Sequence, residues 1–404
     1  MRSFYDSIFF NVPHLRFPEF TGEWKETTLD KIAEITKGSG ISKGQLSEQG
    51  SLCILYGELY TKYKSEIINE VYSRTELDSS SLVKSKANDV IIPCSGETAI
   101  DISTARCVPF NNILLGSDLN IIRLKYDDGG FFAYQLNGVR KKDIACVAQG
   151  VSVVHLYGEN LKQIRVYYPA IEEQKKITHL LSLIDERIAT QNKIIEDLKK
   201  LKSAIVDMLL CNQNSEMLKL GDIGYFVRGL TYANEDVTEN KAATAVIRAN
   251  NLNYGNHVDK GEVVYVSRTP ATSQILRKGD IVICMANGSS ALVGKNSYYP
   301  FNDGQSTVGA FCGIYRTSHP LAKWLMQSQR YKRLVYQSLQ GGNGAIANLN
   351  GDDILNMSFP VMEKEKSKSI IFILEAIEKS LAVNKDLQRS YSTQKSHLLK
   401  QMFI

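Results

Sequence analysis

Two stretches, "EEQKKITHLLSLIDERI" (172–188) and "EKSKSIIFILEAIEKSL" (365–381), decide how this chain is organised. Each has the pattern of a long amphipathic helix. Each also follows a proline in an aromatic segment, "VYYP" (166–169) in the first case and "MSFP" (357–360) in the second. Because the same arrangement occurs twice, the chain has to be compared with itself.

The repeat extends along the whole chain. With a shift of 191 residues, "TLDKIAEITKG" (28–38) falls on "KLGDIGYFVRG" (219–229) and Pro169 falls on Pro360. Beyond these prolines the shift becomes 193. Other aligned pairs are Gly38 with Gly229, Asp89 with Asp280 and Ile177 with Ile370. The sequence therefore predicts a tandem duplication of roughly 190 residues.

The first part of each copy predicts a β-rich domain. Short runs such as "DVIIPC" (89–94) and "DIVICM" (280–285) are separated by Gly, Ser and Asn turns. A helical stretch follows late in each copy, at 131–142 and at 321–339. We expect an α+β fold.

The second part of each copy predicts one helix of nearly 40 residues. Its Ile and Leu residues recur at the 4-3-4-3 spacing of a coiled-coil seam, although an ordinary amphipathic helix lying on its own domain is the alternative. The predicted seam contains Ile177, Leu181, Ile184, Ile188, Gln191 and Ile195 in the first helix and Ile370, Leu374, Ile377, Leu381 and Gln388 in the second. Gln191, Lys202, Asn384, Gln388 and Lys395 interrupt it. In an antiparallel pair that matches 177 with 402, Gln191 comes opposite Gln388, and such a polar pair fixes register at a cost in stability.

These patterns predict four segments and a pseudo-two-fold arrangement of domains and paired helices. The segments are a first recognition-type domain (1–170), a central helix (171–212), a second domain (213–361) and a C-terminal helix (362–404). A fixed spacer between similar domains suits a repetitive partner such as double-stranded DNA.

Composition narrows the class of protein. The 404 residues carry a net charge of +5, which permits nucleic-acid binding without arguing for it. The apolar runs are too short for a membrane-spanning helix, and the N-terminus lacks the pattern of a signal peptide. The seven cysteines form no CxxC pair, so we expect reduced thiols in a cytoplasmic protein, with neither a disulfide framework nor a zinc site.

Motifs of catalysis are absent from the sequence. The six histidines are scattered without metal-ligand spacing. The stretch "GSSALVGKN" (288–296) resembles a phosphate loop, but its glycine spacing is one residue too long and Asn296 stands where Ser or Thr would bind magnesium. The sequence predicts a binding protein without a catalytic or metal site.

Three segments resemble the specificity (S) subunit of type I restriction-modification systems. These are the opening "VPHLRFPEFTGEWKETTLDKIAEITKG" (12–38), the helix start "YYPAIEEQKKITHLLSLIDERI" (167–188) and the terminus "QKSHLLKQMFI" (394–404). The resemblance covers nearly the whole chain. The second copy departs from it after Pro360, where "VMEKEKSKS" replaces the usual "PxxEQ".

The resemblance implies a non-catalytic subunit with two target-recognition domains, each reading one half of a split, asymmetric DNA sequence. The helices would set the spacing and dock two modification subunits, which bring S-adenosylmethionine and methylate adenine. Restriction subunits, with ATP and magnesium, would join them. This chain would bind no cofactor itself. A coiled-coil adaptor for proteins, and an S-like subunit of a methylation-only or phage-exclusion system, remain alternatives.

Polar, Gly-rich loops after strands are the candidates for DNA contact, although such loops are also ordinary turns. In copy one they supply Lys37, Ser39, Lys43, Ser95, Thr98, Gln149 and Ser152, and in copy two Arg228, Tyr232, Arg248, Asn250, Asn251, Asn287, Ser289, Lys295, Gln340 and Asn343. Basic pairs recur at Lys141-Lys142 and Lys332-Arg333, where they would hold phosphates or simply face solvent. Arg248 with Asn250 and Asn251 is the strongest candidate for base readout.

Overall fold

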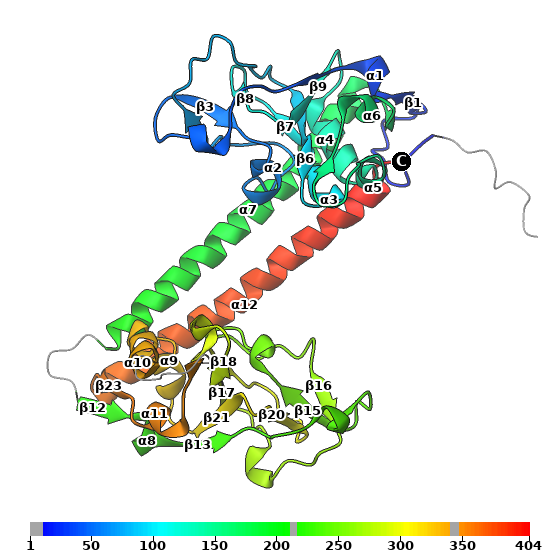
Figure 1. Cartoon of the computed structure of the whole chain (residues 1–404). Coiled ribbons are helices and arrows are strands. Elements are labelled where there is room, and N and C mark those ends of the chain that lie inside the picture. The colour runs from blue at the N-terminus through cyan, green and yellow to red at the C-terminus, as the bar shows by residue number, and fades with distance from the viewer. Residues whose placement is uncertain (1–10, 211–215, 340–346) are drawn as a thin grey trace, which may run out of the picture. The chain divides into compact units, whose positions relative to one another are not determined.

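The computed structural model describes residues 11–210, 216–339 and 347–404 (Figure 1). It divides into two compact units. Unit 1 comprises Met1–Lys193 and Lys385–Ile404, and unit 2 comprises Ile194–Asn384. Each unit therefore combines one β-rich domain with parts of both long helices.

Unit 1 is built on a four-stranded sheet of order β2-β9-β5-β7 and a three-stranded sheet of order β4-β3-β8, together with the separate strand pairs β1-β11 and β10-β6. Its strands are β1 (Lys25–Thr28), β2 (Ala33–Lys37), β3 (Ser51–Ile54), β4 (Ser73–Thr75), β5 (Asp89–Pro93), β6 (Ser95–Gly96), β7 (Arg106–Val108), β8 (Leu114–Leu115), β9 (Leu119–Leu124), β10 (Val154–His155) and β11 (Arg165–Tyr168). Its short helices are α1 (Leu29–Ile32), η1 (Lys43–Gln45), α2 (Glu58–Thr61), α3 (Ala99–Ile102), α4 (Gly129–Asn137), α5 (Lys141–Cys146) and α6 (Gly158–Lys162).

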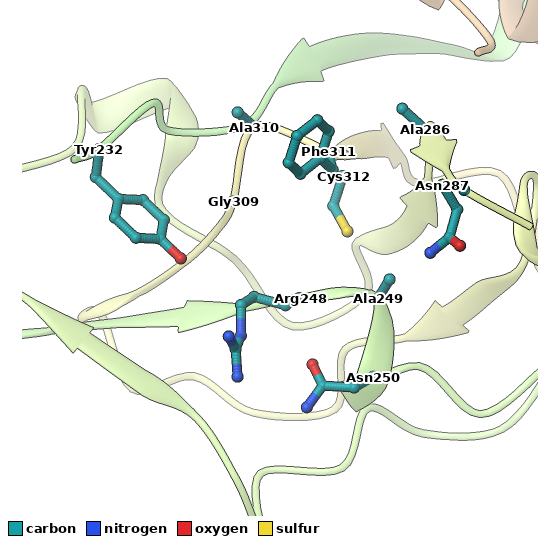
Figure 2. A pocket seen from close by; sticks show the side chains of 11 residues that line it. Tyr232, Arg248, Ala249, Asn250, Ala286, Asn287, Gly309, Ala310, Phe311 and Cys312 are labelled. Atoms are coloured by element: carbon teal, nitrogen blue, oxygen red, sulfur yellow. The ribbon is translucent and has the colours of Figure 1, made fainter. Parts of the chain in front are cut away.

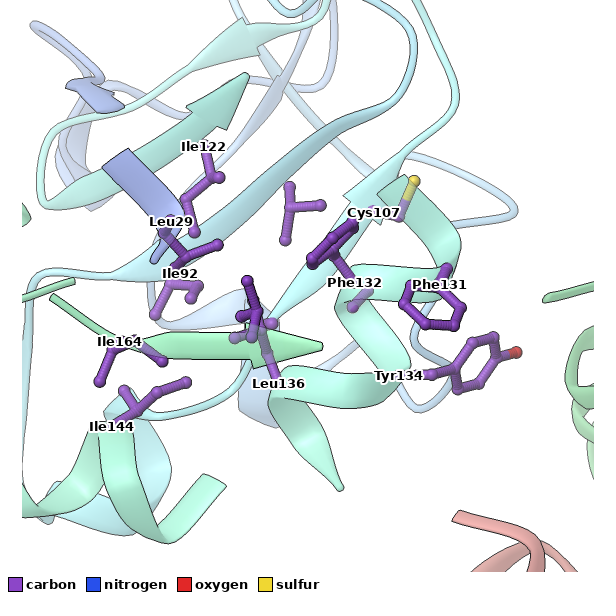
Figure 3. Close-up of a cluster of buried hydrophobic side chains, with 14 of the residues drawn as sticks. Leu29, Ile92, Cys107, Ile122, Phe131, Phe132, Tyr134, Leu136, Ile144 and Ile164 are labelled. Atoms are coloured by element: carbon purple, nitrogen blue, oxygen red, sulfur yellow. The ribbon is translucent and has the colours of Figure 1, made fainter. Parts of the chain in front are cut away.

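Alternate side chains of the central strands in unit 1 point to opposite faces of the sheet, so each face has a hydrophobic core of its own. Val90 and Ile92 of β5 pack into the cluster that contains α4, whose Phe131, Phe132 and Leu136 are fully buried (Figure 3). Ile91, which lies between them in sequence, packs into the cluster shared with β3 and β8. Successive side chains of a strand point to opposite faces, so one central strand supplies both cores.

Unit 2 repeats this topology with a four-stranded sheet of order β13-β21-β17-β19, a second sheet of order β14-β16-β15-β20, and the pairs β12-β23 and β18-β22. Its strands are β12 (Glu216–Lys219), β13 (Gly224–Arg228), β14 (Val237–Thr238), β15 (Thr244–Ile247), β16 (Val264–Val266), β17 (Ile281–Cys284), β18 (Ala286–Asn287), β19 (Asn296–Tyr298), β20 (Ser306–Val308), β21 (Cys312–Thr317), β22 (Ala347–Asn348) and β23 (Ser358–Val361). Its short helices are α8 (Leu220–Ile223), η2 (Asn234–Asp236), η3 (Ala249–Asn251), η4 (Thr272–Gln274), η5 (Ser290–Leu292), α9 (Ala322–Leu325), α10 (Gln329–Leu339) and α11 (Gly351–Leu355). The added strand β14 lies at the edge of the second sheet.

Aligned polar residues hold the two central sheets in the same way. Arg123 forms a two-pronged ion pair with Asp89, at 2.9 and 2.7 Å, and Arg316 pairs with Asp280 at 2.8 and 2.7 Å. The predicted α+β fold and its duplication are confirmed.

Gly38 and Gly229, aligned in the sequence, occupy matching close approaches of the backbone. A Cβ on Gly38 would lie 2.1 Å from the Gly116 carbonyl oxygen, and a Cβ on Gly229 would lie 2.1 Å from that of Gly309. No larger residue fits between these backbones without moving them, which explains why the repeat retains glycine at this position.

The two predicted long helices are α7 (Ile171–Met208) and α12 (Lys364–Gln401), each of 38 residues. Within unit 1, Ile177 of α7 shares a cluster with Met402, just past the end of α12, and in unit 2 Ile195 packs with Ile377 and Leu381. Within unit 1, Asp185 of α7 also pairs with Lys395 of α12, and within unit 2 Val206 shares a cluster with Leu374. Residue numbers therefore rise along one helix as they fall along the other, and the two helices run antiparallel in each unit. The described part of the chain contains no helix long and apolar enough to cross a membrane.

Candidate functional site

Tyr232, Arg248, Asn250 and Asn287, all predicted to contact DNA, line one hollow of unit 2 with a volume of about 620 Å³. The hollow forms where β15 ends, where β20 turns into β21, and beside β18. Phe311, which the sequence did not single out, also lines it and is 69% exposed. We call it the Arg248 hollow (Figure 2).

Arg248 is the residue between β15 and η3, and its side chain projects into this hollow. Its Nε is buried without a hydrogen-bond partner, and no ion pair to its guanidinium is found among the residues that the structure describes. Figure 2 shows the Tyr232 hydroxyl directed toward Arg248 and the Asn250 side chain beside it. An arginine placed in this way retains donors for an external acceptor.

Asn251 has a different role from its neighbours. It is buried, its side-chain oxygen accepts from the Arg248 backbone N–H at 2.9 Å, and its amide donates to the Glu262 carbonyl at 3.0 Å. These bonds shape the turn that presents Arg248 and Asn250. We therefore assign Asn251 to the support of the hollow and not to its surface.

Unit 1 contains a matching hollow of about 550 Å³, which we call the Asp118 hollow. It is lined by Ser42, Lys43, Leu55, Gly57 and Asp118, among others. Asp118 is exposed and has a φ of 60°, a left-handed conformation that Asp tolerates better than most residues. Of these residues, the sequence pointed only to Lys43.

Strand register shows that the two hollows occupy equivalent places. Ile54 pairs with Leu115 in unit 1, and Ile247 pairs with Val308 in unit 2, so the shift here is 193 residues. The 191-residue alignment is wrong in this region because two more residues separate β13 from β15 than β2 from β3. The corrected pairs are Leu55 with Arg248, Gly57 with Asn250, Glu58 with Asn251, Ser117 with Ala310 and Asp118 with Phe311.

Glu58 supports the Asp118 hollow as Asn251 supports the Arg248 hollow. Its carboxylate accepts from the Leu55 backbone N–H at 3.0 Å and from Lys62 at 2.6 Å, and it also accepts from the Ser73 hydroxyl. The same capping bond therefore shapes both turns, while the residues that face each hollow differ in chemistry.

The other predicted residues of copy one lie outside this hollow. Lys37 ends β2 and is exposed, whereas the Ser39 hydroxyl accepts from the Val83 backbone N–H at 3.1 Å. Thr98 caps α3 by accepting from the Asp101 N–H at 3.1 Å. Ser95 pairs with His155 across β6 and β10, and Gln149 bridges to the same histidine, so these two residues come together, with Ser152 exposed in the adjoining loop.

The remaining predicted residues of copy two are scattered around the Arg248 hollow. Arg228, exposed at the end of β13, lines a small neighbouring pocket with Ala286 and Cys312. Ser289 is exposed, and its backbone N–H donates to Asn287 at 3.0 Å, while Lys295 is half-buried. Gln340 and Asn343 lie outside the described residues.

The two basic pairs differ in availability. Lys142, Lys332 and Arg333 are exposed on α5 and α10. Lys141 is half-buried and donates to the Thr104 hydroxyl at 3.3 Å, and burial, with the nearby charge of Arg106, lowers its pKa. Lys141 is therefore engaged within unit 1.

Sequence and structure comparisons place the chain among known proteins. The family model described as "Type I restriction modification DNA specificity domain" matches residues 21–200. The specificity subunit of the type I restriction enzyme EcoKI from Escherichia coli (strain K12) is 29% identical over 150 residues, which cover 35% of this chain and 31% of that subunit. The match thus spans about a third of that relative's length.

Two further comparisons cover nearly all of the chain. The MjaVIII specificity subunit of Methanocaldococcus jannaschii is 22% identical over 95% of this chain and 92% of its own length. The crystal structure of the type I S subunit from M. genitalium superposes with a TM-score of 0.64 at 17% identity, over 97% of this chain and 99% of that one, which bears on the fold. Over nearly its whole length, the chain is similar to type I restriction-modification specificity subunits.

After Pro360 the second copy departs from the pattern of the first, and this has a local structural consequence. In unit 1, Gln174 accepts from the Asp128 N–H at 2.9 Å and donates to Asp127 at 2.8 Å and to the Pro169 carbonyl at 2.9 Å. In unit 2 the aligned residue is Ser367, which lines an open cavity of about 820 Å³. The helix α12 nevertheless begins at Lys364, the residue aligned with the start of α7.

The predicted seam residues lie buried or half-buried along α7 and α12. Gln191 is buried and Gln388 is half-buried, and the proposed pairing of their side chains stays a prediction. Two lysines that interrupt the apolar pattern, Lys202 and Lys395, belong to ion-pair clusters that the seam pattern did not predict.

In the first cluster, Lys395 of α12 pairs with Asp185 of α7 at 2.5 Å and also with Glu66. In the second, Lys202 of α7 pairs with Glu378 of α12 at 2.8 Å, and Lys323 binds the same carboxylate. The 193-residue shift aligns Lys202 with Lys395 and Asp185 with Glu378, a signal that was available in the sequence.

Proposed function

We propose that this chain is the DNA sequence-specificity subunit of a type I restriction-modification complex, in which each β-rich domain reads one half of a split, asymmetric target. The observation that supports this most strongly is the pair of equivalent hollows. Both hollows lie at the same place in the fold, and in both a side chain three residues on accepts from a backbone N–H of the turn. The lining residues differ: Leu55, Gly57 and Asp118 in unit 1 correspond to Arg248, Asn250 and Phe311 in unit 2.

A duplicated scaffold with divergent surfaces is what two different half-sites require. Arg and Asn donors suit purine edges in the major groove, and carboxylates accept from exocyclic amino groups. Lys142, Lys332 and Arg333 would contribute phosphate contacts, which position the domains without selecting a sequence.

The chain would act as a non-catalytic component in the cytoplasm. Among the residues that the structure describes, no group of three His, Cys, Asp or Glu side chains is arranged to hold a metal ion. In the proposed complex, two modification subunits would supply S-adenosylmethionine and methylate adenine, and restriction subunits would supply ATP-dependent translocation and cleavage with magnesium. The helices α7 and α12 would set the spacing of the two domains and dock the modification subunits.

Methylation mapping of a host that carries this gene beside its modification gene tests the proposal. Deletion of this gene alone should abolish adenine methylation at one split motif, and a plasmid copy should restore it. Methylation that persists unchanged after deletion would refute the specificity role.

A further inference from the structure

We infer that the Arg248 hollow takes the major-groove edge of a guanine, so that the half-site read by unit 2 contains a guanine that Arg248 selects. This inference rests on the proposed function and adds to it the base and the residue that recognises it.

The chemistry of the hollow favours guanine. Guanine presents two acceptors, O6 and N7, on one edge, and the planar guanidinium of arginine matches them with two parallel N–H donors. Arg248 has no carboxylate partner among the described residues, and its Nε lies buried without a hydrogen bond. An acceptor brought into the hollow would therefore meet a guanidinium that no other side chain has already neutralised.

The surroundings of Arg248 leave it accessible and restrict its direction. Gly309 lies beside its stem, where a Cβ would come within 3.9 Å of the Arg248 Cγ and 3.7 Å of the Tyr232 ring. The capping bond from Asn251 to the Arg248 backbone N–H fixes the turn below. Exposed Phe311 forms an apolar wall beside these donors, which reduces competition from water.

Unit 1 shows that this chemistry is particular to unit 2. At the place of Arg248 it has Leu55, at that of Asn250 it has Gly57, and Asp118 replaces Phe311. At these aligned positions an arginine and an asparagine of unit 2 correspond to an apolar residue and a glycine of unit 1, although Lys43 and Lys62 also line the Asp118 hollow. The arginine-based contact with guanine therefore belongs to unit 2.

The first test maps methylation in hosts that express the intact modification complex with Arg248→Ala. We expect methylation to spread to sites with other bases at one G·C position in one half of the motif, while the other half stays fixed. Lys332→Ala is the matched control, because it removes a positive charge from the same unit outside the hollow, and it should lower methylation without changing the motif. An unchanged motif with Arg248→Ala, or relaxation at an A·T position, would overturn the inference while leaving the proposed function intact.

A second test stays decisive if Arg248→Ala abolishes methylation altogether. Purified wild-type complex is titrated with duplexes in which each guanine of the motif is replaced in turn by 7-deazaguanine, which lacks the N7 acceptor. Replacement of one particular guanine, in one half of the motif, should lower the affinity about ten-fold or more, as expected for the loss of a good base contact. Uniform affinity across all the replacements would refute guanine recognition, and the absence of any gene-dependent motif would instead refute the proposed function.

Discussion

The two ion-pair clusters on the long helices occupy equivalent positions but carry opposite charge. In unit 1 one lysine, Lys395, serves two carboxylates, Asp185 and Glu66. In unit 2 one carboxylate, Glu378, serves two lysines, Lys202 and Lys323. The duplication thus retained the pair between the helices and changed the third member, which comes from the β-rich domain.

This difference sets the protonation of each cluster. Burial, and then repulsion by Glu66, raises the pKa of Asp185 to about 6, although Lys395 and the Tyr134 hydroxyl, 2.7 Å away, act against the shift. Burial also acts to raise the pKa of Glu378, but Lys202 and Lys323 outweigh it and hold that pKa below its ordinary value. The first cluster has an excess of negative charge and the second an excess of positive charge.

The largest expected effect is the loss of Lys395. Lys395→Met leaves two buried carboxylates without their shared cation, and removal of one partner from a buried ionic cluster costs about 3–5 kcal/mol. Denaturant unfolding, followed by Trp24 in a Trp324→Phe background, measures unit 1, since each unit holds one of the two tryptophans. A loss below about 1 kcal/mol would show that the cluster contributes little.

The pH dependence of unit 1 should be the next largest effect. Because the folded pKa of Asp185 is raised, its contribution to stability is fully present below about pH 4 and is lost as the pH rises through about 6. When the pH is lowered from 7 to 4, the free energy of unfolding of the wild type should therefore rise by about 2 kcal/mol relative to that of Asp185→Asn. Lys395, Tyr134 and, through its charge, Arg106 favour the ionised carboxylate, whereas burial and Glu66 oppose it. A difference in stability that does not change with pH would mean that the first three groups keep Asp185 ionised.

Lys202→Met should have a smaller effect than Lys395→Met and so sharpens the comparison. Glu378 keeps Lys323 as a partner after this change, so we expect a loss of about 1–2 kcal/mol. Fluorescence of Trp324 in a Trp24→Phe background reports unit 2. Equal losses for the two lysines would contradict the difference in charge balance.

The smallest expected effect concerns the seam glutamines. Replacement of both Gln191 and Gln388 by Leu should raise the thermal midpoint by a few degrees, because apolar seam residues stabilise a coiled coil more than polar ones do. Thermal unfolding by circular dichroism measures it. A lower or unchanged midpoint would argue against a buried polar pair.

The sequence predicted the elements that follow from periodicity and repetition. The seam spacing identified α7 and α12, and the self-alignment identified both domains, because burial on one face imposes regular patterns along the chain. The sequence did not predict the ion-pair clusters. Lys202 and Lys395 looked like interruptions of an apolar seam, and Glu66 and Lys323, which complete the clusters, lie far away in the sequence. The sequence also did not identify Phe311 and Asp118 as residues that line the hollows. A hollow forms where several loops meet, and its lining residues follow no periodic pattern along the chain.

The most direct test of the account replaces the second β-rich domain by a copy of the first and maps the methylated motif of the resulting complex. If each domain reads its own half-site, the asymmetric target should become one whose two halves carry the same bases, namely those now read by unit 1. Methylation that remains on the original asymmetric motif would contradict the account, because the second half would then be read without the residues of the Arg248 hollow.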